Sequence, residues 1–293
     1  MFMTGKMPRP RTEPLYSGGN RNKYPITPRF DSAGYHDFIN SHLFSSEDIL
    51  VSQSFNTGQL SCIFAPMKHY SRRPAFSCAF LNGYDSLVEL VKRNWEQKDS
   101  NGKSKQIYSL ACDENLGFAV FFLTDYGSAQ KIVTNTSDVD NNMKLGYKIT
   151  TCTARGPVFY IIMTKDTKQY NGKQEWFISD KWREAEDLIK KHHDKGKIIT
   201  GICYCSGQRK YLVVVTETEI SNQQDYRRFR YLSNLNKWVE EQGTVGFHPT
   251  IIFMDPAEKK TLAVLIKDGT KPRYTCIYDF KVDPKKSLCV YSK

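Results

Sequence analysis

The stretch Gly146-Tyr-Lys-Ile-Thr150 returns as Gly196-Lys-Ile-Ile-Thr200 and again as Gly246-Phe-His-Pro-Thr250, so the three glycines lie 50 residues apart. Each phrase is followed by a turn and then by an apolar run, such as Phe159-Tyr-Ile-Ile-Met163 after the first phrase. A fixed period of this length indicates one supersecondary unit that is used several times. Repeat units mostly build surfaces for partners, so the pattern favours a binding or scaffold protein over an enzyme.

The repeat predicts four pieces in each unit, in a fixed order. The first is a short amphipathic helix, as in Leu87, Leu90, Val91 and Trp95, whose spacing matches one helical face. Three strands follow, the first two joined by turns that contain Gly, Asn, Asp or Pro. The expected fold is therefore mainly β with short helices, a five-unit repeat of a helix plus a three-stranded antiparallel meander. The expected units are approximately 36–83, 84–135, 136–180, 181–233 and 234–282.

The units must pack against one another, because a meander of about 50 residues buries too little surface to be stable alone. Radial packing gives a β-propeller-like closed ring, and linear packing gives an open array. We favour the closed ring, because both chain ends can complete one unit. In that arrangement residues 36–293 form a single repeat domain, and 288–291 supply a closing strand beside the first unit.

The chain is basic: 42 Lys and Arg stand against 31 Asp and Glu in 293 residues, a formal net charge of +11. This balance suggests an acidic partner, which can be nucleic acid, an anionic lipid surface or an acidic protein surface. The alternative is a soluble basic protein whose charge is merely dispersed. No run of about 18 apolar residues occurs, so we expect no membrane-spanning helix and no membrane partner.

Residues 1–35 differ from the rest of the chain. They are rich in Pro and Gly, and carry six basic against two acidic residues. Few apolar side chains are present to offset chain entropy, so this segment should not fold alone. We expect a basic, extended arm that lies on a partner. Its expected partner contacts are Arg9, Arg11, Arg21, Lys23 and Arg29.

Motifs of catalysis are missing from the sequence. It contains no nucleophile elbow, phosphate-binding loop or dinucleotide fingerprint. The six histidines do not pair with Asp, Glu or Cys at metal-ligand spacing, and the eight cysteines form no Cys-x-x-Cys pair. Cys203 and Cys205 would share one face of a strand, where we interpret them as buried thiols. We therefore expect no enzyme, no catalytic residue, no metal and no cofactor. A ligand or enzyme site at the centre of the ring remains as an alternative.

Two basic clusters are candidates for a partner-binding surface. Arg72 and Arg73 form the first, and Arg228 and Arg230 belong to the second, in which Arg227 and three aromatic residues are interleaved. Basic residues between aromatic ones are typical of surfaces that stack nucleic-acid bases. In a strand, however, Arg228 and Arg230 would face away from Phe229, which also fits an amphipathic strand with a solvated basic face.

A helix with Trp, the Gly-x-x-Ile-Thr phrase and an apolar hairpin together resemble one known family. The combination is similar to the repeat region that follows the kinase domain in plant and algal casein-kinase-like kinases. The matching stretches, within about 85–282, are Trp95 with Ile107-Tyr-Ser-Leu-Ala111, Gly146–Thr150 with Met163-Thr-Lys165, and Trp182 with Gly196–Thr200. The chain has no Gly-rich loop, His-Arg-Asp or Asp-Phe-Gly motif, so the kinase activity is not implied. The resemblance implies a non-catalytic binding platform.

A repeat platform with a basic, Pro-rich arm also resembles, in style, structural components of ciliary doublet microtubules. Tubulin has an acidic surface, which would suit a basic chain. We therefore expect a non-enzymatic scaffold that docks on an acidic polymer or large assembly, as a microtubule-associated component of the ciliary or flagellar axoneme. Its partners would be tubulin or neighbouring axonemal proteins, and its location cytoplasmic and cytoskeletal. The alternative is an RNA-associated protein of the organellar ribosomal type, with Arg227, Arg228, Arg230 and the arm on phosphates.

Overall fold

A computed structural model describes the chain at residues 35 and 39 and over 48–56, 59–66, 76–98, 102–124, 126–167, 172–218, 223–267, 275–281 and 290–292. Outside them lie the expected partner contacts of the arm and the first basic pair, which are Arg9, Arg11, Arg21, Lys23, Arg29, Arg72 and Arg73.

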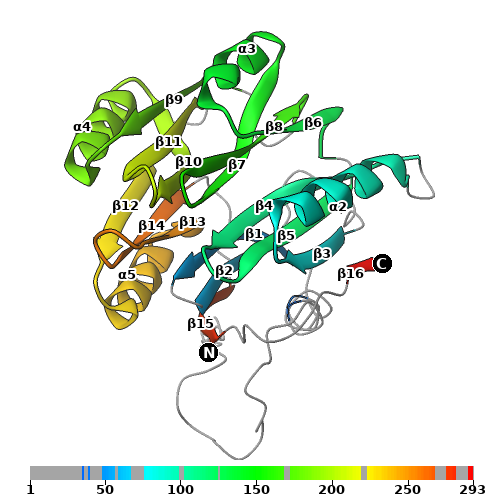
Figure 1. The fold of residues 1–293 in the computed structure, drawn as a ribbon. Helices are drawn as coiled ribbons and strands as arrows, with labels where there is room; N and C mark the ends of the chain where they lie inside the picture. The colour runs from blue at the N-terminus through cyan, green and yellow to red at the C-terminus, as the bar shows by residue number, and fades with distance from the viewer. Residues whose placement is uncertain are drawn as a thin grey trace, which may run out of the picture.

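Strands dominate the described residues, and four α-helices accompany them, which confirms a mainly β class with short helices (Figure 1). The helices are α2 (Tyr84–Glu96), α3 (Val139–Lys144), α4 (Trp182–His193) and α5 (Leu232–Thr244). Five hairpins recur, and their first strands are β1 (Asp48–Asn56), β4 (Lys105–Asp113), β7 (Tyr147–Arg155), β10 (Lys197–Cys205) and β13 (His248–Asp255). Their second strands are β2 (Gln59–Pro66), β5 (Gly117–Thr124), β8 (Val158–Lys165), β11 (Lys210–Glu217) and β14 (Lys260–Lys267). The remaining strands are β3 (Phe76–Leu81), β6 (Ala129–Val133), β9 (Gln174–Ser179), β12 (Gln223–Phe229), β15 (Thr275–Lys281) and β16 (Val290–Ser292).

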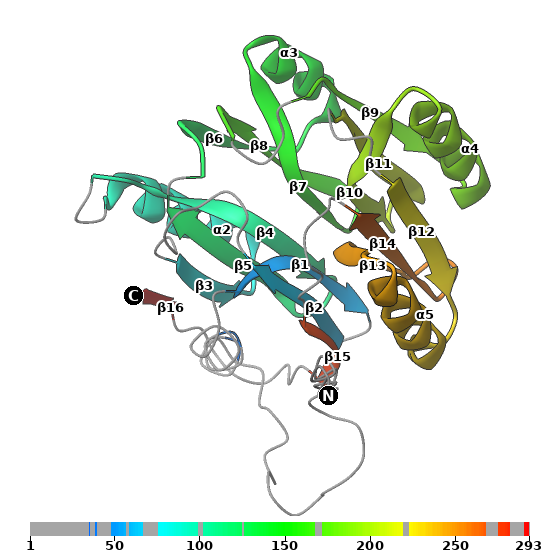
Figure 2. The ribbon, with the colours of Figure 1, turned by 180° about the vertical axis from the view of Figure 1, so that it is seen from behind.

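The strands pair into five separate antiparallel sheets, with the orders β1-β2-β15, β16-β3-β5-β4, β6-β8-β7, β10-β11-β9 and β12-β14-β13. None of these sheets closes into a ring, so the expected propeller-like closed ring is wrong. The physical reason is that backbone hydrogen bonding ends at the edge strands of each sheet, so no continuous ladder of hydrogen bonds runs around the repeat. Neighbouring sheets instead meet side by side through their first strands, as β1 does with β4 and with β13 (Figure 2).

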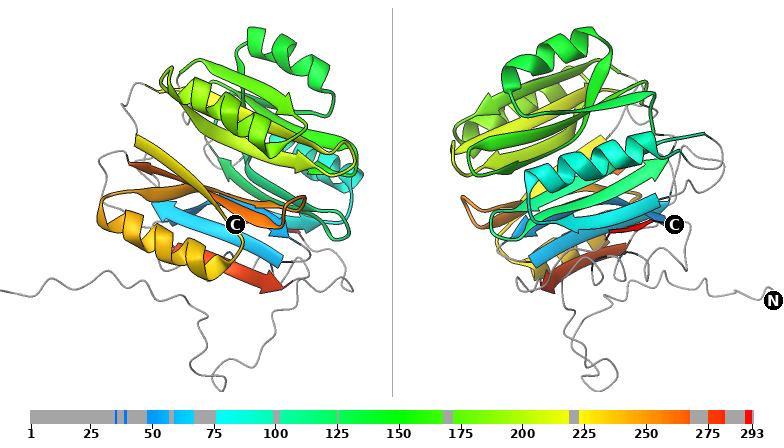
Figure 3. Two further views of the ribbon diagram at one scale, coloured as in Figure 1. Left: turned by 90° about the vertical axis from the view of Figure 1, so that its left-hand side faces the viewer. Right: turned by 45° about the vertical axis from the view of Figure 1, so that its right-hand side comes forward.

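Each sheet combines strands from two of the expected units, which corrects the predicted meander. Strand β6 falls in the expected unit 84–135, yet it pairs with β8 of the unit 136–180, with Ala129 opposite Lys165. Strands β9 and β12 pair with β11 and β14 in the same way. The connecting helix therefore joins one edge of a sheet to the other, and the second hairpin strand is central. The four helices lie outside the strands (Figure 3).

The end of the chain returns to the first two sheets. Strand β15 pairs with β2, and so completes the first sheet. A strand also occurs close to the expected 288–291, at Val290–Ser292, and it pairs with β3 at the edge of the second sheet. Tyr35 is fully buried in the core of the first sheets, and its hydroxyl donates to Gln53 Oε1 over 2.8 Å. Tyr35, at the expected boundary between the arm and the repeat domain, therefore packs in the core.

The core lies on both sides of the central strands. All eight residues of β5 are buried, and β8, β11 and β14 are buried over most of their length. Trp182, Ala185 and Ile189 form the buried face of α4, and Trp238 of α5 is buried as well. Central strands bury both faces, so their sequences are continuous apolar runs rather than alternating ones.

Candidate binding site

The Gly-x-x-Ile-Thr phrase has a structural role that begins at its glycine. Gly146, Gly196 and Gly246 follow the helices with φ of 87°, 75° and 97°. Each amide donates back to a carbonyl near the end of its helix, such as Gly196 N–H to His193 O over 2.9 Å. Residues with a side chain rarely adopt this left-handed conformation. The glycines therefore end the helices and start the hairpins.

The Ile-Thr part of the phrase marks a β-bulge. The register of β7 against β8 shifts between Ile149 and Thr151, and that of β10 against β11 shifts between Ile199 and Gly201. Equivalent shifts occur in β1, β4 and β13. The bulged Thr150 places its hydroxyl 2.9 Å from that of Thr164 on β8. A bulge leaves backbone groups without a partner in their own sheet.

Three glutamines, which we call the bridging glutamines, satisfy those backbone groups from the neighbouring sheet. Gln174 on β9 accepts from the Ile149 amide over 2.6 Å and donates to the Ile149 carbonyl over 3.0 Å. Gln130 makes the same pair of bonds to Ile107, and Gln224 makes it to Ile199. The polar residues of the repeat therefore fasten one sheet to the next.

Serines hold the boundary between the fifth and first hairpins. Ile252 N–H donates to Ser52 Oγ over 3.1 Å, and Met254 N–H donates to Ser54 Oγ over 3.0 Å. These bonds join β13 to β1, strands 200 residues apart in the sequence. The ends of the repeat are thus attached by side chains.

A pocket of about 390 Å³ lies beside this framework, where α4, β12 and the β13–β14 hairpin meet. We call it the α4–β12 pocket. Its lining combines four cationic, two anionic and two aromatic residues, which are Trp182, Arg183, Glu186, Tyr226, Arg227, Arg228, Glu258 and Lys260. Its volume falls within the range of small-ligand and side-chain sites in proteins.

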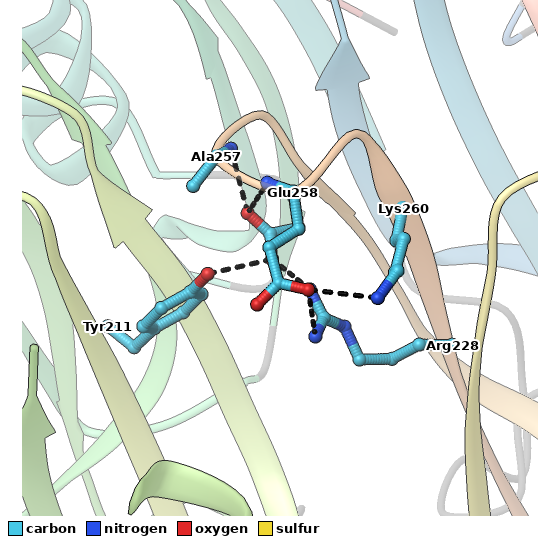
Figure 4. A network of polar contacts seen from close by, with 6 residues as sticks. Tyr211, Arg228, Ala257, Glu258 and Lys260 are labelled. Atoms are coloured by element: carbon cyan, nitrogen blue, oxygen red, sulfur yellow. Dashed lines mark hydrogen bonds and ion pairs between the residues drawn. The ribbon is translucent and has the colours of Figure 1, made fainter. Parts of the chain in front are cut away.

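One side of the pocket is a fixed ion-pair network (Figure 4). Arg228 is paired with Asp255, whose side chain is fully buried, and with Glu258 over 3.1 Å. The Tyr211 hydroxyl donates to Asp255 over 2.8 Å, and burial with the nearby Asp255 raises the pKa of Tyr211. Lys260 donates to Glu258 over 3.0 Å, which holds the pKa of Glu258 below its usual value.

Aromatic rings fix the two arginines of β12 on opposite faces. The guanidinium of Arg228 lies 4.3 Å from the ring centre of Trp182 on α4, and that of Arg227 lies 5.3 Å from the ring centre of Trp238 on α5. Such cation–π contacts hold a charged group in one place while leaving its charge available. The strand alternation predicted from the sequence puts Arg228 and Phe229 on opposite faces, and Phe229 indeed packs on Trp238.

The predicted second basic cluster is divided by the structure. The Arg228 side chain is only 9% exposed, since helix α4 of the neighbouring sheet covers that face of β12. The solvated basic face expected there is therefore wrong for Arg228. Arg230 follows the end of β12 and is exposed, and Tyr231 beside it is 62% exposed. Sequence reasoning missed Arg183 and Lys260, because only the fold brings them to Arg228.

The described residues contain no group of three or more His, Cys, Asp and Glu placed to hold a metal ion. Cys203 and Cys205 are both buried and form no disulfide, and burial raises the pKa of each thiol. Within the described part of the chain, no helix is long and apolar enough to cross a membrane. No protein-family model matches the chain, and no curated protein matches it.

Proposed function

We propose that this protein is a non-enzymatic scaffold that docks a packed repeat domain on an acidic surface of a large assembly. The observation that carries the proposal is the set of bridging glutamines. Gln130, Gln174 and Gln224 each hydrogen-bond to the backbone of the neighbouring sheet, and together they link sheets at three successive boundaries. A repeat whose polar side chains join its own units is suited to presenting a rigid surface.

The net charge of +11 supports an acidic partner. Among acidic assemblies we propose the microtubule of the cilium or flagellum, on the resemblance in style described above. The arm would then add a second basic contact ahead of Tyr35. Two contacts on one polymer reinforce each other through their effective concentration.

Co-sedimentation of the full chain with microtubules over a series of salt concentrations tests this proposal. Binding should weaken as salt increases, because surface charges are screened. Replacing Arg9, Arg11, Arg21, Lys23 and Arg29 by Gln should weaken sedimentation without changing the thermal unfolding of the repeat domain. A chain that stays in the supernatant at low salt would refute the microtubule as partner. Identification of chains that co-purify from cells would then name the assembly.

RNA binding is the second candidate, and one observation favours it. Tyr231 is 62% exposed beside the exposed Arg230, an arrangement that suits stacking on an unpaired base. Filter binding of single-stranded RNA to wild-type protein and to Tyr231→Ala tests it. No retention at low salt rules this candidate out, and retention that depends on Tyr231 supports it over a protein partner.

A further inference from the structure

We propose that the α4–β12 pocket binds an acidic peptide segment of a protein partner, whose carboxylates enter between α4 and β12. This inference rests on the proposed function, since it names the chemistry by which the scaffold would dock. Three features support it: the arrangement of charges in the pocket, the fixed position of Arg228, and the Tyr226 hydroxyl as a hydrogen-bond donor.

The lining of the pocket holds four cationic and two anionic side chains. The side chain of Arg183 makes no ion pair or hydrogen bond with another described residue. The side chain of Arg227 is 56% exposed, and its ion pair with Asp225 is long, at 3.8 Å. Lys260 is 40% exposed and shares Glu258 with Arg228. An entering carboxylate therefore meets Arg183, whose guanidinium has no described counterion and can bind it bidentately, with Lys260 and Arg227 at the edge of the pocket.

The floor of the pocket is already ordered. Arg228 is held by Asp255, by Glu258 and by the Trp182 ring. Its side chain therefore loses little conformational entropy when a ligand binds. Tyr226 adds a hydroxyl donor. Burial raises the pKa of Tyr226 to about 12, with Glu186 next in effect, so the hydroxyl stays protonated at neutral pH. This hydroxyl bonds to no other described residue.

An acidic peptide fits this pocket better than a nucleic acid does. The guanidinium of Arg228 lies over the Trp182 ring at 4.3 Å, so a nucleotide base could not use that ring for stacking. The basic arm of the same chain cannot be the occupant, because six of its residues are cationic and only two are anionic.

The test uses the full chain and a fluorescent peptide of ten glutamates, with binding measured by anisotropy. Wild-type protein should bind, and more weakly at higher salt. The variant Arg183→Glu/Arg227→Glu reverses two cations at the pocket and should bind about tenfold or more weakly. The control Lys92→Glu/Lys144→Glu changes the net charge of the chain by the same amount, but on α2 and α3. Its affinity for the peptide should stay within about twofold of wild type. Both pairs are solvent-exposed, and equal thermal unfolding shows that the variants are folded.

Each outcome decides between alternatives. Equal loss in the pocket variant and the control overturns the pocket and leaves only general charge attraction. Displacement of the peptide by inorganic phosphate or by single-stranded RNA at lower concentration overturns the peptide assignment. If pocket variants sediment with the acidic assembly as wild type does, this inference fails and the proposed scaffold function stands. If wild type binds the peptide through the pocket but docks on no assembly, the proposed function fails instead.

Discussion

Removal of one bridging glutamine should destabilise the repeat domain far more than removal of a surface glutamine. Gln174 is 5% exposed and bonds to the amide and carbonyl of Ile149, and its Nε2 also donates to Thr216 over 3.2 Å. Gln174→Ala leaves both backbone groups of Ile149 without partners in a buried place. Thr216 keeps its 2.7 Å contact with Thr200, so its hydroxyl adds little to the loss.

The magnitude follows from the two orphaned groups. Each buried backbone group left unpaired costs about 1–3 kcal/mol, so the variant should lose about 1–4 kcal/mol once the freed side-chain entropy is included. A water molecule entering the space would find polar partners and bring the loss towards the lower end. Gln224→Ala removes the same pair of bonds from Ile199 in a less buried place, and should cost about half as much.

Equilibrium unfolding in guanidinium chloride, followed by tryptophan fluorescence, measures the difference. Gln223→Ala is the matched control, because Gln223 is exposed on the same strand as Gln224. It should change the free energy of unfolding by less than about 0.5 kcal/mol. Hydrogen exchange gives a local readout, since the Ile149 amide should lose protection in Gln174→Ala. An Ile149 amide that stays protected, or a Gln174→Ala loss no larger than that of the control, refutes the bridge.

Three further predictions concern buried charge, pH and the repeat glycines. Asp255→Ala leaves Glu258 as the remaining ion-pair partner of the buried Arg228, and should lower the free energy of unfolding by about 3–5 kcal/mol in denaturant. A variant as stable as wild type would mean that Glu258 and water compensate the charge of Arg228. Burial lowers the pKa of His193 in the folded protein, so the unfolded chain binds a proton first, and stability should fall as pH drops below about 6.5. His193→Gln should flatten that dependence in unfolding curves at several pH values, and an unchanged slope would assign it to other groups. Gly196→Ala places a side chain on a residue whose φ is 75°, a left-handed conformation that should cost about 1–2 kcal/mol although no atom lies close to the added Cβ. Thermal unfolding measures the loss. A decrease in melting temperature no larger than that of an alanine substitution at an exposed helix position would contradict the backbone strain.

Local sequence patterns were sufficient to predict the elements. The apolar run Phe159–Met163, which follows the first glycine phrase, forms most of the central strand β8. Period, turn residues and helix-ending glycines depend on neighbours a few residues away. For the same reason, the alternation of side chains along a strand is enough to place Phe229 opposite Arg228 on β12.

Pairing between sheets could not be predicted in this way. Strand β6 joins the sheet that follows it, and β15 returns across more than 200 residues to β2. Several registers and partners satisfy the same apolar pattern, and only long-range packing selects one of them. The same limit applies to Gln174, whose role appears only when Ile149 of the neighbouring sheet lies against it.

The sequence by itself determined the recurrence of the hairpins, the mainly β class and the basic charge of the chain. The tertiary structure alone decided which strands share a sheet and where the charges of β12 lie. Arg228 is one of several similar arginines in the sequence, and burial against α4 distinguishes it from Arg227 and Arg230. The physical reason is that periodicity is a local property, whereas burial and ion pairing depend on segments far apart in the chain.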